Sequence, residues 1–468
     1  MDSRSVGVTP SSSLDKHDTG VLQKADNRFL HPWEEIESYG GNARTILSSG
    51  DGVYVQDSHG NRLLDGPGGM WCVNVGHGNA EIAEAIYRQA LTISYCSSWS
   101  LSNEPASLLA DKLSSLTPGD LNNVFFTCGG STAVDSALRF VMFRNNYMGR
   151  KNKKHFISRI NAYHGSTFLA ASVSGKGRDK NYQDFHSSFS HFISDPAYHR
   201  DGDGRTHEEY NRAKADELEE MILSIGAENV AAFIAEPVLA SGGVIIPPPG
   251  YYSACHEVCR RHDVIFIADE TVTAFGRLGH FFSCEEVFDV VPDILICAKG
   301  LTSGYMPLGA MIVSDRLIAD MRGGHKSGIY ANGYTYSGHP LATAAALKNI
   351  EIMERPGFME HAREKGAHFE NRIHELADIE IVANTRAVGL MGCVECCPPG
   401  EAESLPADYA LGEQIDRHCQ KAGLLVRPLI NMCVLSPPLI ITNAQIDEIF
   451  DILRQGIERV AAEVGKSG

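Results

Sequence analysis

Two short apolar runs, at residues 264–268 and 294–298, constrain the fold of this chain more than any other feature of its sequence. The first run ends in Asp269 and Glu270, and the second ends in Lys299. Short apolar runs bounded by turn residues are typical of strands that are buried on both faces of a parallel sheet. Ligands of open α/β sheets bind at the carboxyl ends of such strands. We therefore expect the Asp269 carboxylate and the Lys299 amine to face one cavity; the alternative is two unrelated surface residues beyond strand ends.

The order of the expected elements indicates an α/β protein. Strand patterns alternate with helical patterns from about residue 124 to 315, which predicts a mostly parallel sheet with helices on both faces. A chain of 468 residues is long enough for two domains that share a substantial core. We expect a flexible polar arm, then a smaller α+β domain built from the N- and C-terminal parts around a large domain, at residues 1–25, 26–80 with 341–468, and 81–340 respectively.

Composition and charge argue against several classes of partner. The sequence has 41 Lys and Arg against 58 Asp and Glu, a formal net charge of −17, which argues against nucleic acid or an anionic membrane. No apolar run approaches the roughly 18 residues of a membrane span. The polar N-terminus lacks the apolar core of a secretory signal, so we expect a cytoplasmic protein.

The twelve cysteines do not have the pattern of a disulfide framework or a metal site. Several lie inside apolar runs, as Cys297 does, where a buried thiol behaves as a small apolar group. Cys393 and Cys396 have the CxxC spacing of zinc ligands, but no second CxxC or HxxxH pair lies at a suitable distance. We expect no metal.

A glycine-rich turn between an expected strand and an expected helix is a candidate phosphate site. The strand covers 124–127, the turn contains Gly129, Gly130 and Ser131, and the helix follows from Ala133. Such a turn presents free backbone N–H groups to an anion, and the helix dipole adds to the attraction. The turn is neither a P-loop nor a GxGxxG sequence, so an ordinary helix N-terminus remains the alternative.

Two aromatic segments are candidates for the wall of a ligand site. Tyr163 and His164 follow an expected strand and precede Gly165, which suits stacking on a flat ligand. Trp71 follows a glycine-rich segment at 66–69. Packing in the core is the alternative for each of these side chains.

Pyridoxal phosphate is one cofactor that needs all of these parts. It requires a lysine for a Schiff base and a carboxylate that keeps its pyridine nitrogen protonated. It also requires an anchor for its phosphate and a flat group against its ring. A lysine in such a site has a lowered pKa, which makes its amine a nucleophile and a carrier of protons.

The chain from Trp71 to Pro340 resembles the class III, fold type I aminotransferases, and among them the pyruvate-accepting omega-amine group. Similarity covers almost everything beyond residue 50, and the motifs together are specific although none is alone. The segments that carry it are LDGPGGMWCVNVGHG, FFTCGGSTAVDSAL, RINAYHGST, FIAEPVLASGGVIIPPPGYY, IADETVTAFGRLG, ICAKGLTSGYMPLGA, YTYSGHPLA and GLLVRP with LSPPLIIT.

The resemblance implies roles for residues around the cofactor. Lys299 carries the Schiff base and moves the proton, and Asp269 pairs with the pyridine nitrogen. Tyr163 stacks on the ring with His164 beside it. The resemblance also implies a homodimer with shared active sites, in which dimers can pair into tetramers. The remaining expected cofactor contacts are Gly129, Gly130, Ser131, Glu236, Thr271 and, from the neighbouring subunit, Thr335.

The same resemblance implies a small-molecule amine donor and a keto acid acceptor. Arg427 is expected to bind the acceptor's carboxylate, because a guanidinium binds a carboxylate with two parallel hydrogen bonds. The implied reaction moves the amino group of a primary amine or omega-amino acid to pyruvate. The expected lining of the substrate pocket is Met70, Trp71, Trp99, Tyr163 and Ser241.

Departures from the family pattern leave the amine donor open. The turn at 129–132 replaces the usual Ser-Gly-Ser-Glu, Leu239 replaces a frequent glutamine, and 429–431 replaces the usual Gly-Asp. Thr271 stands where a valine usually packs on the ring, so its hydroxyl either contacts the cofactor or acts as a β-branched isostere.

Three other functions are consistent with parts of the same pattern. A 2-oxoglutarate-using aminotransferase and a decarboxylating or aminomutase relative would keep the same lysine and aspartate. A non-catalytic regulator that binds pyridoxal phosphate is disfavoured, because only about 50 residues precede the resemblance and the net charge is acidic.

Overall fold

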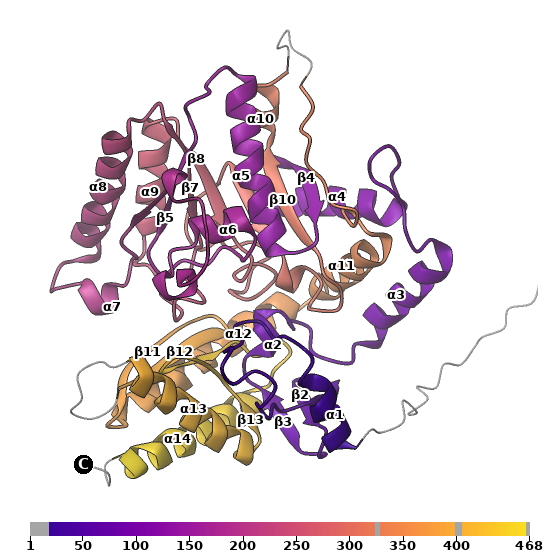
Figure 1. Cartoon of the computed structure of the whole chain (residues 1–468), viewed down its shortest axis with the longest axis vertical. Coiled ribbons are helices and arrows are strands. Elements are labelled where there is room, and N and C mark those ends of the chain that lie inside the picture. The colour runs from indigo at the N-terminus through magenta and orange to yellow at the C-terminus, as the bar shows by residue number, and fades with distance from the viewer. Residues whose placement is uncertain (1–17, 323–327, 398–404, 465–468) are drawn as a thin grey trace, which may run out of the picture.

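The computed structural model describes residues 18–322, 328–397 and 405–464, and a seven-stranded sheet lies at the centre of its larger part (Figure 1). Five neighbouring strands of the sheet are parallel, and β10 is antiparallel to both of its neighbours. The strands, in spatial order, are β4 (Leu121–Thr127), β10 (Gly309–Ser314), β9 (Ile294–Cys297), β8 (Ile265–Asp269), β7 (Val230–Ala235), β5 (His155–Arg159) and β6 (Ser190–Ile193).

The prediction of a mostly parallel sheet is therefore confirmed, and β10 is the exception. The chain returns from β9 to β10 through η3 (Lys299–Leu301) and a short loop, without a crossover helix. A parallel neighbour requires a longer crossover connection, so the short return places β10 antiparallel.

The central sheet is buried on both faces. In β8, Ile265 and Ile267 pack in a cluster with residues of α5 (Gly130–Tyr147), whereas Phe266 and Ala268 pack in a cluster on the opposite face. This alternation follows from the two-residue period of a strand. The helices that contribute to the second cluster are α3 (Ala80–Thr92), α4 (Glu104–Leu116), α8 (His207–Ile225), α9 (Tyr251–Arg261) and α11 (Pro340–Met353).

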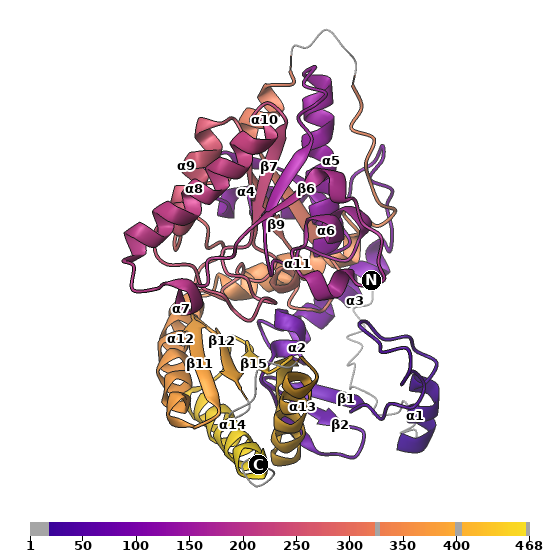
Figure 2. The same ribbon diagram turned by 60° about the vertical axis from the view of Figure 1, so that its left-hand side comes forward.

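The smaller part of the molecule combines the two ends of the chain, and Figure 2 shows it below the large sheet. One four-stranded sheet has the order β1 (Leu47–Asp51), β2 (Tyr54–Asp57), β3 (Arg62–Asp65) and β13 (Leu424–Leu425). The other has the order β11 (Val382–Val388), β12 (Met391–Cys396), β15 (Met432–Leu435) and β14 (Arg427–Leu429). Helices α12 (Phe358–His374), α13 (Leu405–Ala422) and α14 (Asn443–Val464) belong to the same part.

One core holds these N- and C-terminal segments together. Val53 and Leu64 are buried in the same apolar cluster as Phe369 and Phe450, far along the chain. Leu64 and Leu425 lie in β3 and β13, which pair in parallel. This arrangement supports the expected division near residues 80 and 340, which we retain as a proposal.

The segment expected to be a loose arm contains a helix that the sequence analysis did not predict. Helix α1 (Thr19–Asp26) begins after Asp18, whose carboxylate accepts a hydrogen bond from the backbone of Gly20. The rest of the expected arm, residues 1–17, lies outside the described residues. The remaining short elements are α2 (Gly68–Trp71), α6 (Phe168–Val173), α7 (Tyr198–Asp201), α10 (Asp315–Ala319), η1 (Gly177–Lys180), η2 (Ser187–Phe189) and η4 (Glu375–Asp378).

Over the described ranges, no helix combines the length and the apolar character needed to cross a membrane. In the same ranges, no cluster of three or more His, Cys, Asp or Glu side chains is placed to hold a metal ion.

Candidate active site

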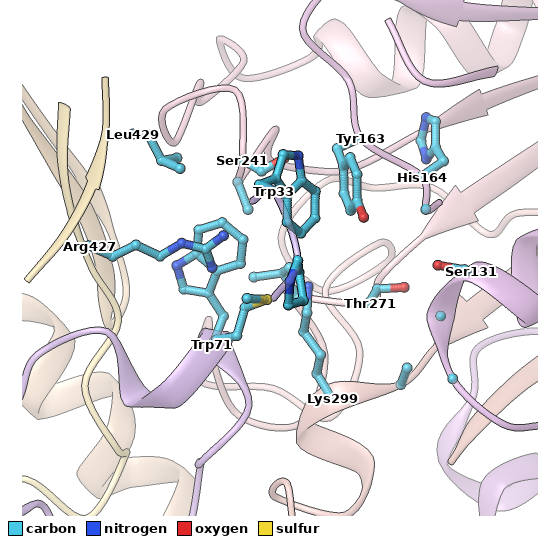
Figure 3. A pocket seen from close by; sticks show the side chains of 18 of the residues that line it. Trp33, Trp71, Ser131, Tyr163, His164, Ser241, Thr271, Lys299, Arg427 and Leu429 are labelled. Atoms are coloured by element: carbon cyan, nitrogen blue, oxygen red, sulfur yellow. The ribbon is translucent and has the colours of Figure 1, made fainter. Parts of the chain in front are cut away.

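A cavity of about 850 Å³ lies where the strands of the large sheet end and the smaller part of the molecule begins (Figure 3). Asp269 and Lys299 both line it, as their positions beyond two neighbouring strands predicted. The smaller part contributes residues of α2 and β14. Of the residues that the sequence analysis assigned to the site, only Trp99 and Thr335 do not line this cavity.

Asp269, the last residue of β8, is a buried carboxylate with fixed partners. Its Oδ2 lies 2.7 Å from Nδ1 of His164, and its Oδ1 accepts a hydrogen bond of 3.1 Å from the backbone of Thr271. Burial by itself raises the pKa of Asp269, but the hydrogen bond and charge of His164, with help from Thr271, outweigh it and hold the pKa below its ordinary value. The site therefore keeps an ionised carboxylate out of water.

His164 lines the cavity, as expected, and it also makes a contact that the sequence did not predict. Its Nε2 lies 3.2 Å from the hydroxyl of Ser158 in β5, and its ring is buried behind Asp269. Both ring nitrogens thus have partners, which fixes the orientation of the imidazole. The geometry indicates that His164 positions Asp269.

Lys299 begins η3 in a strained backbone conformation. Its φ of 40° lies in the left-handed region that non-glycine residues seldom adopt. Gly300 follows, and a Cβ atom there would lie 2.5 Å from the amide nitrogen of Asn74, so a glycine lets the Asn74 segment pack closely. Strain of this kind is concentrated at functional sites, where the surrounding packing holds it.

The amine of Lys299 is buried next to an aromatic ring. Its Nζ lies 5.1 Å from the centre of the Trp71 ring. Burial lowers the pKa of Lys299 to about 8; the negative charge of Asp269 opposes this effect, and the positive charge of Arg427 adds to it. The unprotonated amine, which a nucleophile requires, is therefore a minor form near neutral pH but far more abundant than in an ordinary lysine.

The glycine-rich turn forms the N-terminus of α5 at the edge of the cavity. Ser131 accepts a hydrogen bond of 3.1 Å from the backbone of Ser166. Gly165 has a φ of 135°, and a Cβ atom there would lie 2.5 Å from the Ser131 hydroxyl. At Gly130, a Cβ atom would lie 3.0 Å from the methyl carbon of Thr271. The two glycines thus let both neighbouring loops approach a helix N-terminus, which favours an anion such as phosphate.

Tyr163 lines the cavity next to the acidic side chain of Glu236 and the aromatic side chain of Trp33. Its hydroxyl lies 2.8 Å from that of Ser166, and its backbone N–H donates to the carboxylate of Glu236 at 3.0 Å. Burial raises the pKa of Glu236. Figure 3 shows the ring of Trp33 beside Tyr163, with the ring centres 6.0 Å apart.

Arg427, at the start of β14, lies over the indole of Trp71 (Figure 3). Its Cζ is 4.5 Å from the ring centre, and burial lowers its pKa. The Nη1 of Arg427, the indole nitrogen of Trp71 and the hydroxyl of Ser241 are buried and make no hydrogen bond within the described part of the chain. Buried polar groups are nearly always hydrogen-bonded, so three such groups around one cavity indicate a ligand site. Met70 also lines the cavity.

Trp99 and Thr335 lie together, but on the exterior. The side chain of Trp99 is 94% exposed, and Thr335 is exposed. Their loops are joined by a hydrogen bond of 3.0 Å from Ser98 to the carbonyl of Ser337. The expectation that Trp99 lines the substrate pocket is not met within one chain, because Trp99 is exposed and does not line the cavity.

The family comparisons agree with this geometry. The model of the family described as aminotransferase class III matches residues 38–457. The chain belongs to the class III aminotransferases. It is therefore an aminotransferase of fold type I that uses pyridoxal phosphate.

Relatives with high coverage differ in their acceptors. A putrescine–pyruvate aminotransferase of Pseudomonas aeruginosa is 36% identical over 94% of this chain and 96% of its own. A diaminobutyrate–2-oxoglutarate transaminase of Halomonas elongata is 35% identical over 92% of this chain and 94% of its own. The solved omega-transaminase of Pseudomonas jessenii in complex with PMP is 31% identical, with a TM-score of 0.91 over 96% of this chain and 100% of that chain.

The residues of this aminotransferase fit the cofactor of its family. The N-terminus of α5 suits the phosphate, and an ionised Asp269 suits a protonated ring nitrogen. Lys299 has the lowered pKa of an amine that attacks an aldehyde. The aromatic side chain of Tyr163 lines the space between these groups.

Sequence reasoning missed several residues that line the cavity of this aminotransferase, among them Trp33 and Lys176. Trp33 is one of only three tryptophans and stands outside any helical or strand pattern, which was the available signal. Lys176 had no such signal, because its sequence neighbours read as an ordinary polar loop.

Proposed function

We propose that this aminotransferase moves the amino group of a primary amine or omega-amino acid to pyruvate. The position of Arg427 carries the proposal. Its guanidinium lies over the ring of Trp71, which also faces the amine of Lys299, and its Nη1 has no partner. A carboxylate bound there would place a neighbouring keto carbon near Lys299 and the apolar ring of Trp71, which suits the short methyl group of pyruvate. The Pseudomonas aeruginosa relative named for pyruvate supports this choice.

The residues of the chain divide the chemistry among them. Pyridoxal phosphate, when bound, stores the amino group between the two half-reactions and withdraws electrons from the substrate carbon. Asp269, kept ionised by His164, holds a proton on the pyridine nitrogen. Lys299, with its lowered pKa, takes a proton from the substrate and returns it, since its amine is partly unprotonated near neutral pH.

The same proposal assigns binding roles to the other walls. Gly129, Gly130 and Ser131, at the start of α5, hold the phosphate, and Tyr163 lies against the ring. Glu236 fixes the backbone of Tyr163. Trp71, Met70 and Ser241 enclose the substrate.

We also propose a homodimer in which Trp99 and Thr335 of one subunit approach the cavity of the other. Large apolar side chains are exposed around both residues, which is unusual for a monomer's surface. They are Tyr87, Leu91, Ile93, Tyr95, Leu101, Leu108 and Tyr336. Sedimentation of the holoenzyme with Trp99→Lys tests this: a lysine in the interface should produce monomers, and an unchanged dimer would reject the assignment.

A panel of amines with pyruvate and 2-oxoglutarate as competing acceptors tests the reaction. We expect alanine to form in preference to glutamate, in equal amount to the aldehyde or ketone and without release of carbon dioxide. Glutamate as the main product would reject pyruvate in favour of the acceptor named for the Halomonas elongata relative. Release of carbon dioxide without alanine would indicate a decarboxylase.

A further inference from the structure

Lys176 is a buried cation at the active-site cavity that the proposed reaction does not yet use. It stands immediately before η1, lines the cavity, and is 7% exposed. Its Nζ lies 5.6 Å from the centre of the Tyr163 ring. In the ranges that the structure describes, this Nζ makes no hydrogen bond and no ion pair, and it lies over the ring of Tyr163.

The charged groups around Lys176 do not neutralise it. Arg178 and Asp179, its neighbours in the chain, form an ion pair with each other at 3.3 Å. Burial lowers the pKa of Lys176 to about 8; Arg178 and Arg427 add to the decrease, and Asp179 and Glu236 oppose it. Glu236 is already bonded to the backbone of Tyr163. Lys176 thus keeps its positive charge at neutral pH without a close counter-ion.

Two cations whose side chains have no hydrogen-bond or ion-pair partner in the described residues, the buried Lys176 and the partly buried Arg427, therefore line the same cavity from different parts of the molecule. Taking a charge out of water is costly unless an opposite charge meets it. A guanidinium can satisfy one carboxylate by itself through two parallel hydrogen bonds. A second cation, which lies over the ring of Tyr163, is thus more than one carboxylate needs, and it indicates a second carboxylate position.

We propose that Lys176 binds the carboxylate at the far end of an omega-amino acid donor, whereas Arg427 binds the carboxylate of the keto acid acceptor. This inference rests on the proposed function, because it names the donor class of the same site. Lys176 is then a specificity-determining residue: it favours amino acids over plain amines and repels the second ammonium group of a diamine.

The test compares donors that differ only in the far carboxylate, with pyruvate at a fixed saturating concentration. Each of β-alanine, 4-aminobutyrate and 5-aminopentanoate is paired with the plain amine of the same carbon number. A charge-assisted hydrogen bond contributes about 1.5–3 kcal/mol, so Lys176→Met should raise the KM of the preferred amino acid roughly 10- to 150-fold. The ratio of kcat/KM between the paired donors should fall by the same factor, and putrescine should become a better donor.

Two further variants make the result specific to the charge at this position. Lys176→Arg should recover most of the preference for the amino acid, which also guards against a variant that fails to fold. Lys180→Met removes a lysine four residues further along, whose amine faces the rings of Phe185 and Phe192 away from the cavity. This matched control should leave the donor preference as it is in the unmodified enzyme.

The pH dependence of the donor preference provides a second readout. As the pH rises through about 8, Lys176 loses its charge, and the preference for the amino acid should decline. The titration of Lys299 affects both donors of a pair equally and cancels in their ratio. In Lys176→Arg the guanidinium stays charged, so the preference should persist above pH 9.

The possible failures can be told apart. If no donor transfers its amino group and no cofactor is bound to Lys299, the proposed function itself is wrong. If transfer proceeds but Lys176→Met weakens amino acids and plain amines equally, only the inference is wrong. It is also wrong if the variant loses pyridoxal phosphate on dialysis, because Lys176 would then serve the cofactor, or if the unmodified enzyme accepts plain amines alone.

Discussion

The side chains of Asp269 and Arg427 differ in how many of their hydrogen-bonding atoms have a partner within the protein. Asp269 is hydrogen-bonded to His164 and to the backbone of Thr271, and His164 is held in turn by Ser158. Arg427 lies over Trp71 with an unpaired Nη1. A group that serves a resident cofactor can be fixed by the fold in advance. A group that must bind one substrate after another has to remain without a partner in the protein. Its unpaired hydrogen-bond donors therefore mark the place where the substrates bind.

The largest effect is expected at Lys299, whose pKa is influenced by the charges of both Asp269 and Arg427. Lys299→Ala removes the covalent attachment of the cofactor and the carrier of the proton, so kcat should fall by at least about 10⁴-fold. Borohydride reduction of the unmodified enzyme, followed by peptide mass analysis, should place the cofactor on Lys299. A label on Lys176, the other buried lysine of the cavity, would overturn the assignment.

Arg427→Ala should weaken the binding of the keto acid acceptor without changing the contacts of Asp269. The loss of a charged hydrogen bond of about 1.5–3 kcal/mol should raise the KM for pyruvate roughly 10- to 150-fold. The KM for a plain amine should change much less, because such a donor has no carboxylate. Arg427→Lys keeps the charge but loses the two-pronged geometry, and we expect an intermediate KM. Equal changes for pyruvate and amine would show that Arg427 only supports the fold.

The difference between the two regions also explains which parts of the site were predictable. Asp269 and Lys299 follow buried strands, and the carboxyl ends of neighbouring parallel strands meet at one edge of a sheet. Local pattern therefore located them. The mostly parallel sheet was predictable for the same reason, whereas the reversal of β10 depends on the missing crossover helix after Lys299.

Long-range contacts were not predictable from local pattern. The hydrogen bond between His164 and Asp269 joins residues 105 positions apart, so the expectation that His164 lies beside the ring missed its contact with the carboxylate. Trp33 lines the cavity only because a segment far away in the sequence folds against Tyr163, and Lys176 reaches the same ring through the fold of the loop that precedes η1. Trp99 was assigned to the substrate pocket by the family resemblance, but it is exposed in the single chain.

A smaller effect is expected when His164 is changed, because it acts through Asp269. His164→Phe removes the interaction that holds the pKa of Asp269 down, while burial still raises that pKa. Asp269 should then become protonated at a higher pH, and the acid limb of the kcat profile should move upward in pH. Activity near pH 9 should remain closest to that of the unmodified enzyme. A uniform loss of kcat at every pH would indicate a merely structural role.

The smallest effect is expected at Thr271, which stands between the carboxylate and the phosphate turn. The backbone N–H of Thr271 donates a hydrogen bond to Asp269, and its methyl group lies near Gly130. Its hydroxyl is buried and makes no hydrogen bond within the described residues. Thr271 nevertheless helps to lower the pKa of Asp269. Thr271→Val keeps the shape and removes a polar group whose burial without a partner costs about 1–3 kcal/mol, so apoenzyme stability should stay equal or increase. Thermal unfolding of the apoenzyme and titration with pyridoxal phosphate would measure both effects. A tenfold loss of cofactor affinity would instead show that the hydroxyl contacts the cofactor, and it would place Thr271 among the groups that, like Arg427, wait for a ligand.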